Sequence, residues 1–143
     1  MSRINFMDFA ESISGNSDCI RRKVGAIIVK NEMIIAIGYN HQPEKCKKCN
    51  ITGCIRIDAC IPSGEQQNIC RAIHAEQSAL LFALKNKVDV IDSEMYITLQ
   101  PCATCAKLII ESGITTIFYK EKYNDKLSLE MLKEAGVRLI YCG

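Results

Sequence analysis

Two short motifs have the residue types and spacing needed to bind a metal ion and move protons. His74-Ala75-Glu76 places a histidine and a glutamate two positions apart, and Pro101-Cys102-Ala103-Thr104-Cys105 contains a C-x-x-C pair. We expect each motif to open a helix, so that both sulfurs turn toward one point and the helix N-terminus stabilises their thiolates. His74, Cys102 and Cys105 would leave the fourth position of a tetrahedral zinc free, which is typical of a catalytic zinc.

Glu76 is the expected proton carrier beside this metal. Zinc lowers the pKa of a coordinated water to about 7, which supplies hydroxide at neutral pH. A carboxylate that lies next to the metal without ligating it accepts the water proton and delivers it to a ring nitrogen and a leaving amine. C-x-x-C alone would also fit a redox pair or half of a structural zinc site. The combination H-x-E with P-C-x-x-C is the pattern of zinc deaminases, and it predicts hydrolytic removal of an amino group.

Composition limits the class of protein. A chain of 143 residues with 48% apolar and 24% charged residues fits one domain, which needs no disulfides to hold its core. Met1 to Glu11 lacks the apolar segment of a signal peptide, and no stretch approaches the roughly 20 apolar residues of a membrane span. With 9 cysteines, an odd number, we expect thiols and metal in a reducing cytoplasm. A net charge of +2 predicts no nucleic-acid partner.

Helices and strands alternate in the second half of the sequence. This alternation favours an α/β sheet with parallel pairs covered by helices, in a single domain over residues 1–143. We expect helices at 3–13, 72–87, 104–112 (closed by Gly113) and 127–135, and strands at 24–29, 33–39, 94–99, 114–119 and 137–141.

Residues 41–70 form a cysteine-rich insert without hydrophobic periodicity. A structureless segment of this length inside a compact domain is expected to be functional or to be stapled. The insert contains Cys46-Lys47-Lys48-Cys49, which is itself a C-x-x-C with metal spacing.

The chain resembles the cytidine deaminase superfamily, and within it the microbial deoxycytidylate (dCMP) deaminases that carry a cysteine-rich insert ahead of H-A-E-Q. The resemblance extends over nearly the whole chain. It rests on the segments Cys19 to Val29, Gly38-Tyr39-Asn40, Gly53 to Arg56, Ile61 to Gly64, Cys70 to Gln77, and Tyr119 with Tyr123-Asn124-Asp125.

This resemblance implies a three-layer α/β/α sandwich around a five-stranded mixed sheet. It implies zinc-dependent hydrolysis of dCMP to dUMP and ammonia, which feeds thymidylate synthesis. It further implies a homo-oligomer, often a hexamer, that is activated by dCTP and inhibited by dTTP, with Mg²⁺ as a possible companion of the nucleotide.

The resemblance also assigns candidate substrate contacts. It maps a deoxyribose contact to Asn40, whose amide can donate to and accept from a sugar hydroxyl, although Asn40 also fits a turn residue that closes the strand. Cations near the expected rim suit a phosphate, with arginine favoured over lysine because it binds phosphate oxygens in a bidentate way. The candidate set is Asn40, Arg22, Lys23, Arg71, Ala75, Tyr119 and Tyr123.

A second, structural zinc is expected from the remaining cysteines. By resemblance its ligands are Cys19, Cys49, Cys54 and Cys70, and the C-x-x-C spacing makes Cys46 the substitute. Cys60 and Cys142 have no assigned role.

Two kinds of alternative stay open. The first is a deaminase of another substrate, namely dCTP, cytidine, a free base or adenosine in tRNA. The second is a non-catalytic zinc-binding module, although zinc knuckles and ribbons lack a glutamate two residues from a ligand. Replacing Glu76 with alanine separates these classes, because an enzyme keeps its metal and loses turnover.

Overall fold

A five-stranded mixed sheet organises the chain, as seen in a computed structural model that describes residues 3–62, 65–66 and 69–143. Its strands lie in the order β2-β1-β3-β4-β5. β1 runs antiparallel to β2 and β3, whereas β3, β4 and β5 are parallel. The bounds are β1 Gly25–Lys30, β2 Met33–Tyr39, β3 Glu94–Leu99, β4 Thr116–Glu121 and β5 Arg138–Tyr141.

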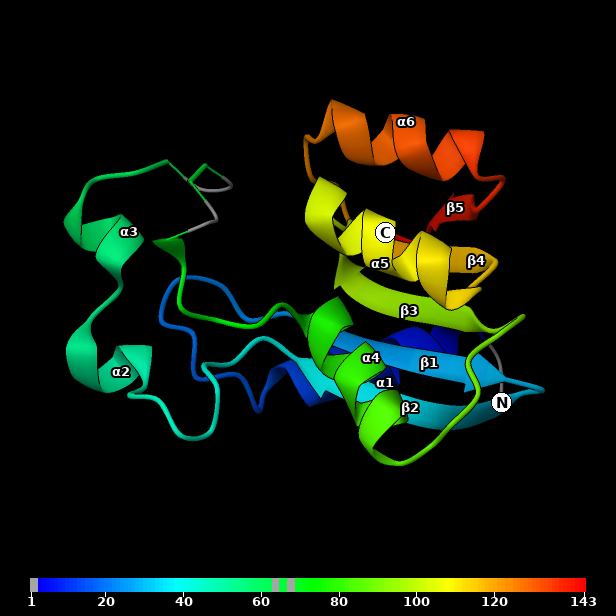
Figure 1. The fold of residues 1–143 in the computed structure, drawn as a ribbon, viewed down its shortest axis with the longest axis horizontal. Helices are drawn as coiled ribbons and strands as arrows, with labels where there is room; N and C mark the ends of the chain where they lie inside the picture. Colours follow the sequence, from blue (N-terminus) through cyan, green and yellow to red (C-terminus); the bar gives the residue numbers. More distant parts are fainter. Residues whose placement is uncertain (1–2, 63–64, 67–68) are drawn as a thin grey trace.

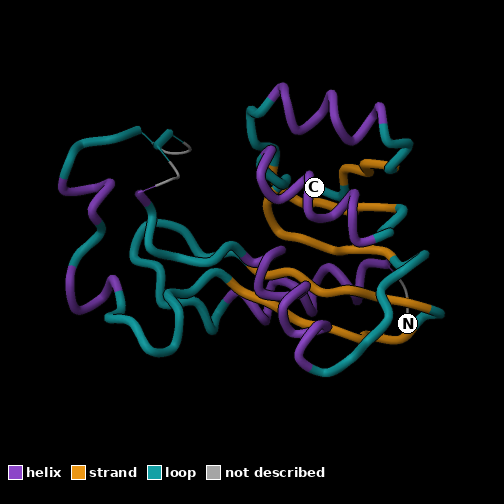
Figure 2. The backbone as a smooth tube through the Cα atoms, in the orientation of Figure 1, coloured by secondary structure: helices purple, strands orange, loops and turns teal. Residues whose placement is uncertain are grey.

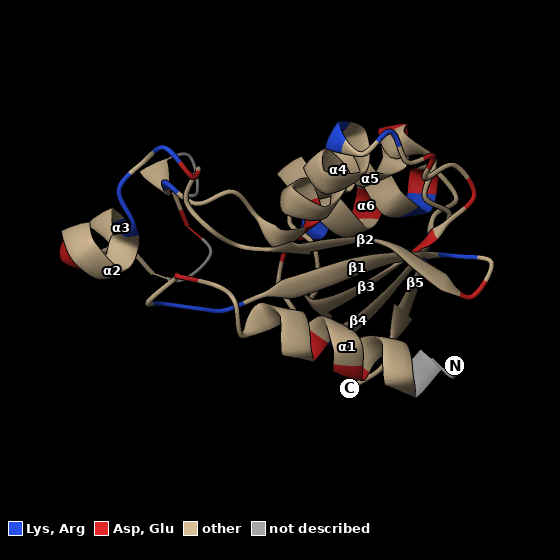
Figure 3. Ribbon diagram, turned by 90° about the horizontal axis from the view of Figure 1, so that it is seen from below, with Lys and Arg blue, Asp and Glu red and all other residues tan. Residues whose placement is uncertain are grey.

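Helices cover both faces of this sheet, which confirms the expected α/β/α layers (Figure 3). On one face lies a single helix, whose Phe6, Met7 and Ala10 pack against apolar side chains of β1, β3 and β4. On the other face, three helices bury a larger core. The helix bounds are α1 Arg3–Ser14 on the first face, and α4 Ala75–Lys85, α5 Ala103–Ser112 and α6 Lys126–Glu134 on the second.

Gly38 brings α4 close to the sheet. A Cβ at this position would lie 2.2 Å from the backbone nitrogen of Ala79 and 2.4 Å from the carbonyl oxygen of Ala75. Only a residue without a side chain allows this approach. The contact places the first turn of α4 beside the end of β2, where Asn40 follows.

The insert leaves the sheet domain through a narrow neck. His41 and Ile73 form an isolated antiparallel bridge with hydrogen bonds of 3.1 and 2.7 Å between their backbones. Beyond it the chain projects to one side of the sheet as loops with two short helices, α2 Cys49–Thr52 and α3 Ile55–Asp58 (Figures 1 and 2). We did not predict these helices, because a single turn is too short to show periodicity.

The predicted bounds of two elements were wrong by a few residues. α4 begins at Ala75 and not at residue 72, because Ile73 is extended and paired with His41. β4 spans Thr116–Glu121 and not 114–119, since its pairing with β3 starts at Thr116. In the described part of the chain no helix has the length and apolar character that crossing a membrane requires.

Candidate active site

Two helix N-termini bring the predicted zinc ligands together. His74 is the N-cap of α4, and Cys102 is the N-cap of α5, directly after Pro101 at the end of β3. The Nδ1 atom of His74 lies 3.2 Å from Sγ of Cys105 and 3.5 Å from Sγ of Cys102. All three ligand atoms lie within 4.8 Å of one another.

This geometry fits zinc. Ligand atoms on a tetrahedral zinc lie roughly 3–4 Å apart, given bonds of about 2.0–2.3 Å. Cys105 is fully buried and Cys102 nearly so, which protects the sulfurs from competing water. Among the residues that the structure describes, this is the one group of three or more histidine, cysteine or acidic side chains close enough to share an ion.

Without the metal, the three groups compete for protons. The hydrogen bond between the two thiols lowers the pKa of Cys102 to about 4 and, with burial, raises the pKa of Cys105. The hydrogen bond to Cys102 raises the pKa of His74, against the opposing effect of burial. A divalent cation resolves this competition, because it holds two thiolates and a neutral imidazole together.

Glu76 lies in the first turn of α4 with only 4% of its surface exposed. Burial raises the pKa of its carboxyl to about 7, and the nearby His74 opposes that rise. The Cys105 thiol also contacts this carboxyl. This position and burial fit the proton carrier that the sequence predicts, and the catalytic role of Glu76 stays a prediction.

Asp125 and Ser128 hold the P-C-x-x-C loop in position. One oxygen of Asp125 accepts a hydrogen bond from the Ala103 amide at the start of α5 (2.9 Å), and the other accepts from the Ser128 amide at the start of α6 (3.1 Å). The Ser128 hydroxyl donates to the Pro101 carbonyl (2.7 Å). A single carboxylate therefore satisfies two helix N-termini and orients the turn that carries Cys102.

His74, Cys102 and Glu76 line a cavity, whereas the third ligand, Cys105, is fully buried. The lining of the cavity comes from the segment before β1, from the neck, from the insert and from the ends of β3 and β4. The lining residues are Cys19, Arg21, Arg22, Val24, Asn40, Arg56, Cys70, Ala72, His74, Ala75, Glu76, Leu99, Gln100, Cys102 and Tyr123.

Four of the predicted substrate contacts line this cavity, and three do not. Those that line it are Arg22, Asn40, Ala75 and Tyr123. Lys23 instead lines a neighbouring hollow. Arg71 is exposed, and its charge opposes the rise in the pKa of Cys49. Tyr119 is buried, and its ring packs against Tyr141 with centroids 5.4 Å apart.

The side-chain amide of Asn40 forms hydrogen bonds with backbone groups. Its Oδ1 accepts from the Val24 amide at 2.8 Å, and its Nδ2 donates to the Arg22 carbonyl at 2.7 Å. The side chain thus closes the turn and fixes the approach to β1. One Nδ2 hydrogen remains for a ligand, because the amide carries two donors.

Two cations that line the cavity, Arg21 and Arg56, are absent from the predicted set of substrate contacts. Arg56 comes from α3 in the insert, far from the motifs in sequence. The signal available was a shared spacing, because each arginine follows a cysteine by two positions, in Cys19-Ile20-Arg21 and in Cys54-Ile55-Arg56.

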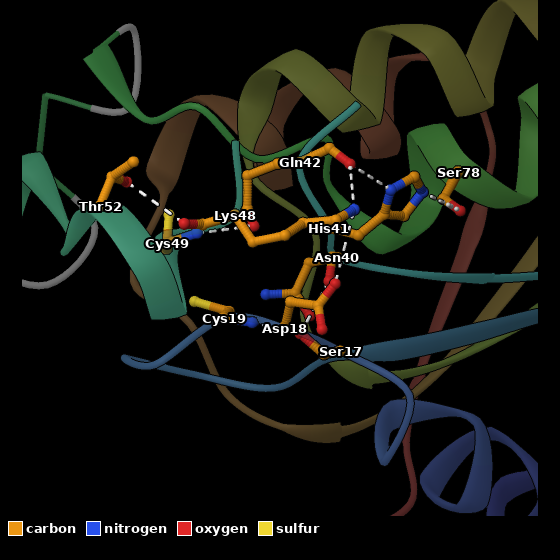
Figure 4. A network of polar contacts seen from close by, with 10 residues as sticks. All are labelled: Ser17, Asp18, Cys19, Asn40, His41, Gln42, Lys48, Cys49, Thr52 and Ser78. Carbon is orange, nitrogen blue, oxygen red and sulfur yellow. Dashed lines mark hydrogen bonds and ion pairs between the residues drawn. The ribbon is translucent and has the colours of Figure 1, made fainter. Parts of the chain in front are cut away.

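A network of polar contacts joins the insert to the sheet domain (Figure 4). The buried Gln42 accepts from the Cys49 amide through its Oε1 (3.0 Å), and its carbonyl accepts from Nδ1 of His41 (2.7 Å) and Nζ of Lys48 (3.3 Å). Lys48 also pairs with Asp18 at 3.6 Å. These contacts hold the start of α2 beside the segment that carries Cys19.

An α/β/α sheet with a His/Cys/Cys group and a glutamate two residues from the histidine is the architecture of the zinc-dependent deaminases. The chain belongs to the cytidine and deoxycytidylate deaminase family, whose zinc-binding region it matches over residues 1–121.

Individual relatives agree with this assignment. The chain is 35% identical to a deoxycytidylate deaminase of Schizosaccharomyces pombe over 135 residues, which cover 94% of the chain but only 42% of that protein. It is 34% identical to the deoxycytidylate deaminase of Mycobacterium phage D29 over 82% of the chain and 92% of the phage protein. A dCMP deaminase of cyanophage S-TIM5, solved in complex with dCMP and dUMP, is 29% identical with a TM-score of 0.82 and 99% of both chains covered.

Proposed function

We propose that the chain catalyses the hydrolytic deamination of dCMP to dUMP and ammonia, and so supplies a thymidylate precursor. The observation that carries the proposal is one cavity lined by two members of the His74, Cys102 and Cys105 group, by Glu76 and by arginine side chains. Such a cavity suits a ligand with a base at one end and a phosphate at the other. The likeness to yeast and phage deoxycytidylate deaminases supports the same substrate.

Each chemical role falls to a named side chain. His74, Cys102 and Cys105 hold the zinc, which when bound supplies a Lewis acid that makes water nucleophilic at neutral pH. Glu76 accepts the proton of the attacking water and delivers it to N3 of the ring, and it then moves the proton of the new C4 hydroxyl to the amino nitrogen. A C–O bond forms at C4, the C–N bond breaks, and ammonia leaves.

A substrate panel tests this proposal. Zinc-loaded protein is incubated separately with dCMP, dCTP, cytidine and deoxycytidine, and ammonia is measured. We expect the highest kcat/KM for dCMP. Preference for dCTP would overturn the assigned substrate and keep the chemistry, whereas no ammonia from any of these substrates would overturn the proposed function.

We also propose a structural zinc in the insert, held by Cys19, Cys49, Cys54 and Cys70. Burial raises the pKa of Cys49, and the nearby thiols of Cys54, Cys19 and Cys70 raise it further. The predicted substitute, Cys46, is exposed. In the described residues these sulfurs do not reach the mutual distances of the His74 group, so metal binding would draw them together.

The insert needs such a metal site because its described residues form no apolar core. Its described residues between 42 and 72 include few buried side chains, while Ile51, Ile55 and Ile57 are exposed. The buried ones are Gln42, Cys49, Cys54, Arg56 and Ile61. A segment with so little apolar burial usually depends on metal or disulfides, and all nine cysteines are free thiols.

Metal content tests the second site. We expect two zinc ions per chain in the wild type and one in a Cys54→Ser variant. Cys46→Ser is the matched control and should keep both. One zinc per chain in the wild type would overturn the second site.

The remaining expectations stay predictions. Exposed leucines on α4 and α5 (Leu81, Leu84 and Leu108) offer an apolar face for the contact between subunits of the expected homo-oligomer. Light scattering measures the molar mass in solution and so tests whether the protein is an oligomer. Activation by dCTP, inhibition by dTTP and a role for Mg²⁺ are tested by measuring the rate of dCMP deamination with and without each of these compounds. Free thiols throughout support the reducing cytoplasm.

A further inference from the structure

The cysteine-rich insert contributes a buried cation to the cavity. Arg56 is only 7% exposed, although it is a charged residue in the insert, which has few buried side chains. Its Nε donates to the carbonyl of Glu65 at 3.0 Å. This bond fixes the plane of the guanidinium, and within the described residues its remaining nitrogens have no hydrogen-bond partner at the cavity that the side chain lines.

Arg21, from the segment before β1, is held in a similar way. Its Nη2 donates to the Ile61 carbonyl, also in the insert, at 2.7 Å. Its Nη1 is buried and has no hydrogen-bond partner in the described part of the chain. Carbonyls that follow α3 therefore brace two guanidinium groups that line one cavity.

Neither guanidinium has a counter-charge within the described residues. The ion pairs found there link Arg22 to Glu121, Lys30 to Asp89, Lys48 to Asp18 and Lys120 to Glu11. Residues 63–64 and 67–68, outside the description, are Ser, Gly, Gln and Asn and carry no carboxylate. A buried charge without a partner is costly, so a cavity built this way favours an anionic ligand.

The same cavity joins these cations to the zinc site. His74 and Arg56 both line it. A ligand whose reacting base lies at the zinc would thus meet Arg56 with its other end.

We propose that Arg56, with Arg21 beside it, binds the substrate phosphate and makes the enzyme select a nucleotide over a nucleoside. This inference rests on the proposed deaminase function of the same cavity. A guanidinium binds phosphate oxygens in a bidentate way, and its charge needs no carboxylate once the phosphate is bound. Arg22, which sequence reasoning favoured, is exposed and already paired with Glu121.

Kinetics on a matched substrate pair test the inference. We compare wild type, Arg56→Gln, Arg56→Lys and the control Arg138→Gln, an exposed arginine on β5, with dCMP and deoxycytidine. Arg56→Gln should lower kcat/KM for dCMP roughly tenfold to a hundredfold, as loss of a charged hydrogen bond implies. Its kcat/KM for deoxycytidine should stay within about twofold of wild type, and Arg138→Gln should match wild type on both. An equal loss on both substrates, or no loss on dCMP, would overturn the inference.

A binding measurement separates this inference from the proposed reaction. Calorimetric titration of Glu76→Gln, with and without Arg56→Gln, compares dCMP with deoxycytidine and requires no turnover. We expect the second substitution to weaken dCMP alone. If wild type releases no ammonia yet this difference holds, the reaction is wrong and the phosphate site stands. If Arg56→Gln does not fold, Arg56→Lys replaces it, and an unchanged ratio of the two affinities would contradict the inference.

Discussion

Asn40 illustrates how a single side chain serves both structure and site. It closes two hydrogen bonds to the backbone of residues 22–24 while it lines the cavity, so the two roles expected from the sequence do not exclude each other. The amide of Val24 depends on it, because that residue is buried away from water.

The Asn40→Ala variant measures the structural role. Loss of the Asn40 side chain leaves the buried Val24 amide without a hydrogen-bond partner, which should lower the free energy of unfolding by about 1–3 kcal/mol in urea denaturation. Asn50→Ala, at an exposed position in α2, is the control and should change little. Unchanged stability together with a raised KM for dCMP would mean that Asn40 is a substrate contact alone.

The grouping of His74, Cys102 and Cys105, with Glu76 close by, was predictable because each motif is local. Two residues separate the cysteines, and one separates histidine from glutamate, so a helix start suffices to orient each pair. The cavity arginines were not predictable in this way. Arg21 and Arg56 meet only because the insert folds back over the segment before β1, and that is a tertiary event.

At the scale of elements, helix ends do most of the positioning. The N-cap residues of α4 and α5 are zinc ligands, and the N-cap of α6 is Asp125, which also caps α5. The alternation of helices and strands was read correctly from hydrophobic patterns. The start of α4 was not, since the pairing of Ile73 with His41 overrides the apolar periodicity that continues through residue 72.

The shared cap gives a prediction for Asp125→Ala. Loss of one helix cap costs typically about 1 kcal/mol, so loss of both should lower the free energy of unfolding by about 2 kcal/mol. The affinity for the catalytic zinc should also fall, because the turn that carries Cys102 is no longer held. Denaturation and competition with a zinc chelator measure the two effects. Glu130→Ala, exposed on α6, is the control, and equal behaviour of the two variants would refute the shared cap.

Taken as a whole, the molecule consists of a sheet domain with two apolar cores and a lobe, the insert of residues 41–70, whose described residues form none. The sheet domain is stabilised by burial, whereas we expect the lobe to depend on the neck, the polar network of Gln42 and metal. The lobe also holds Arg56, so its order bears on substrate selection.

Removal of zinc should therefore act on the lobe first. With a chelator, trypsin should cut at the lobe lysines Lys45, Lys47 and Lys48 at least about tenfold faster, while the sheet domain stays resistant, as expected for a unit of low local stability. Mass spectrometry of the fragments measures the order of cleavage. Cys54→Ser with zinc present should behave like the chelated wild type. Equal cleavage rates with and without metal would show that the lobe needs no zinc.

The most direct test of the central claim compares ammonia release from dCMP by wild type and Glu76→Gln at equal zinc content. Glutamine keeps the size of the side chain and removes its ability to carry a proton. We predict that the variant retains the zinc at His74, Cys102 and Cys105 and releases ammonia about 10²- to 10⁴-fold more slowly. A variant that works at the wild-type rate, or a zinc-loaded wild type that releases no ammonia, would contradict the account.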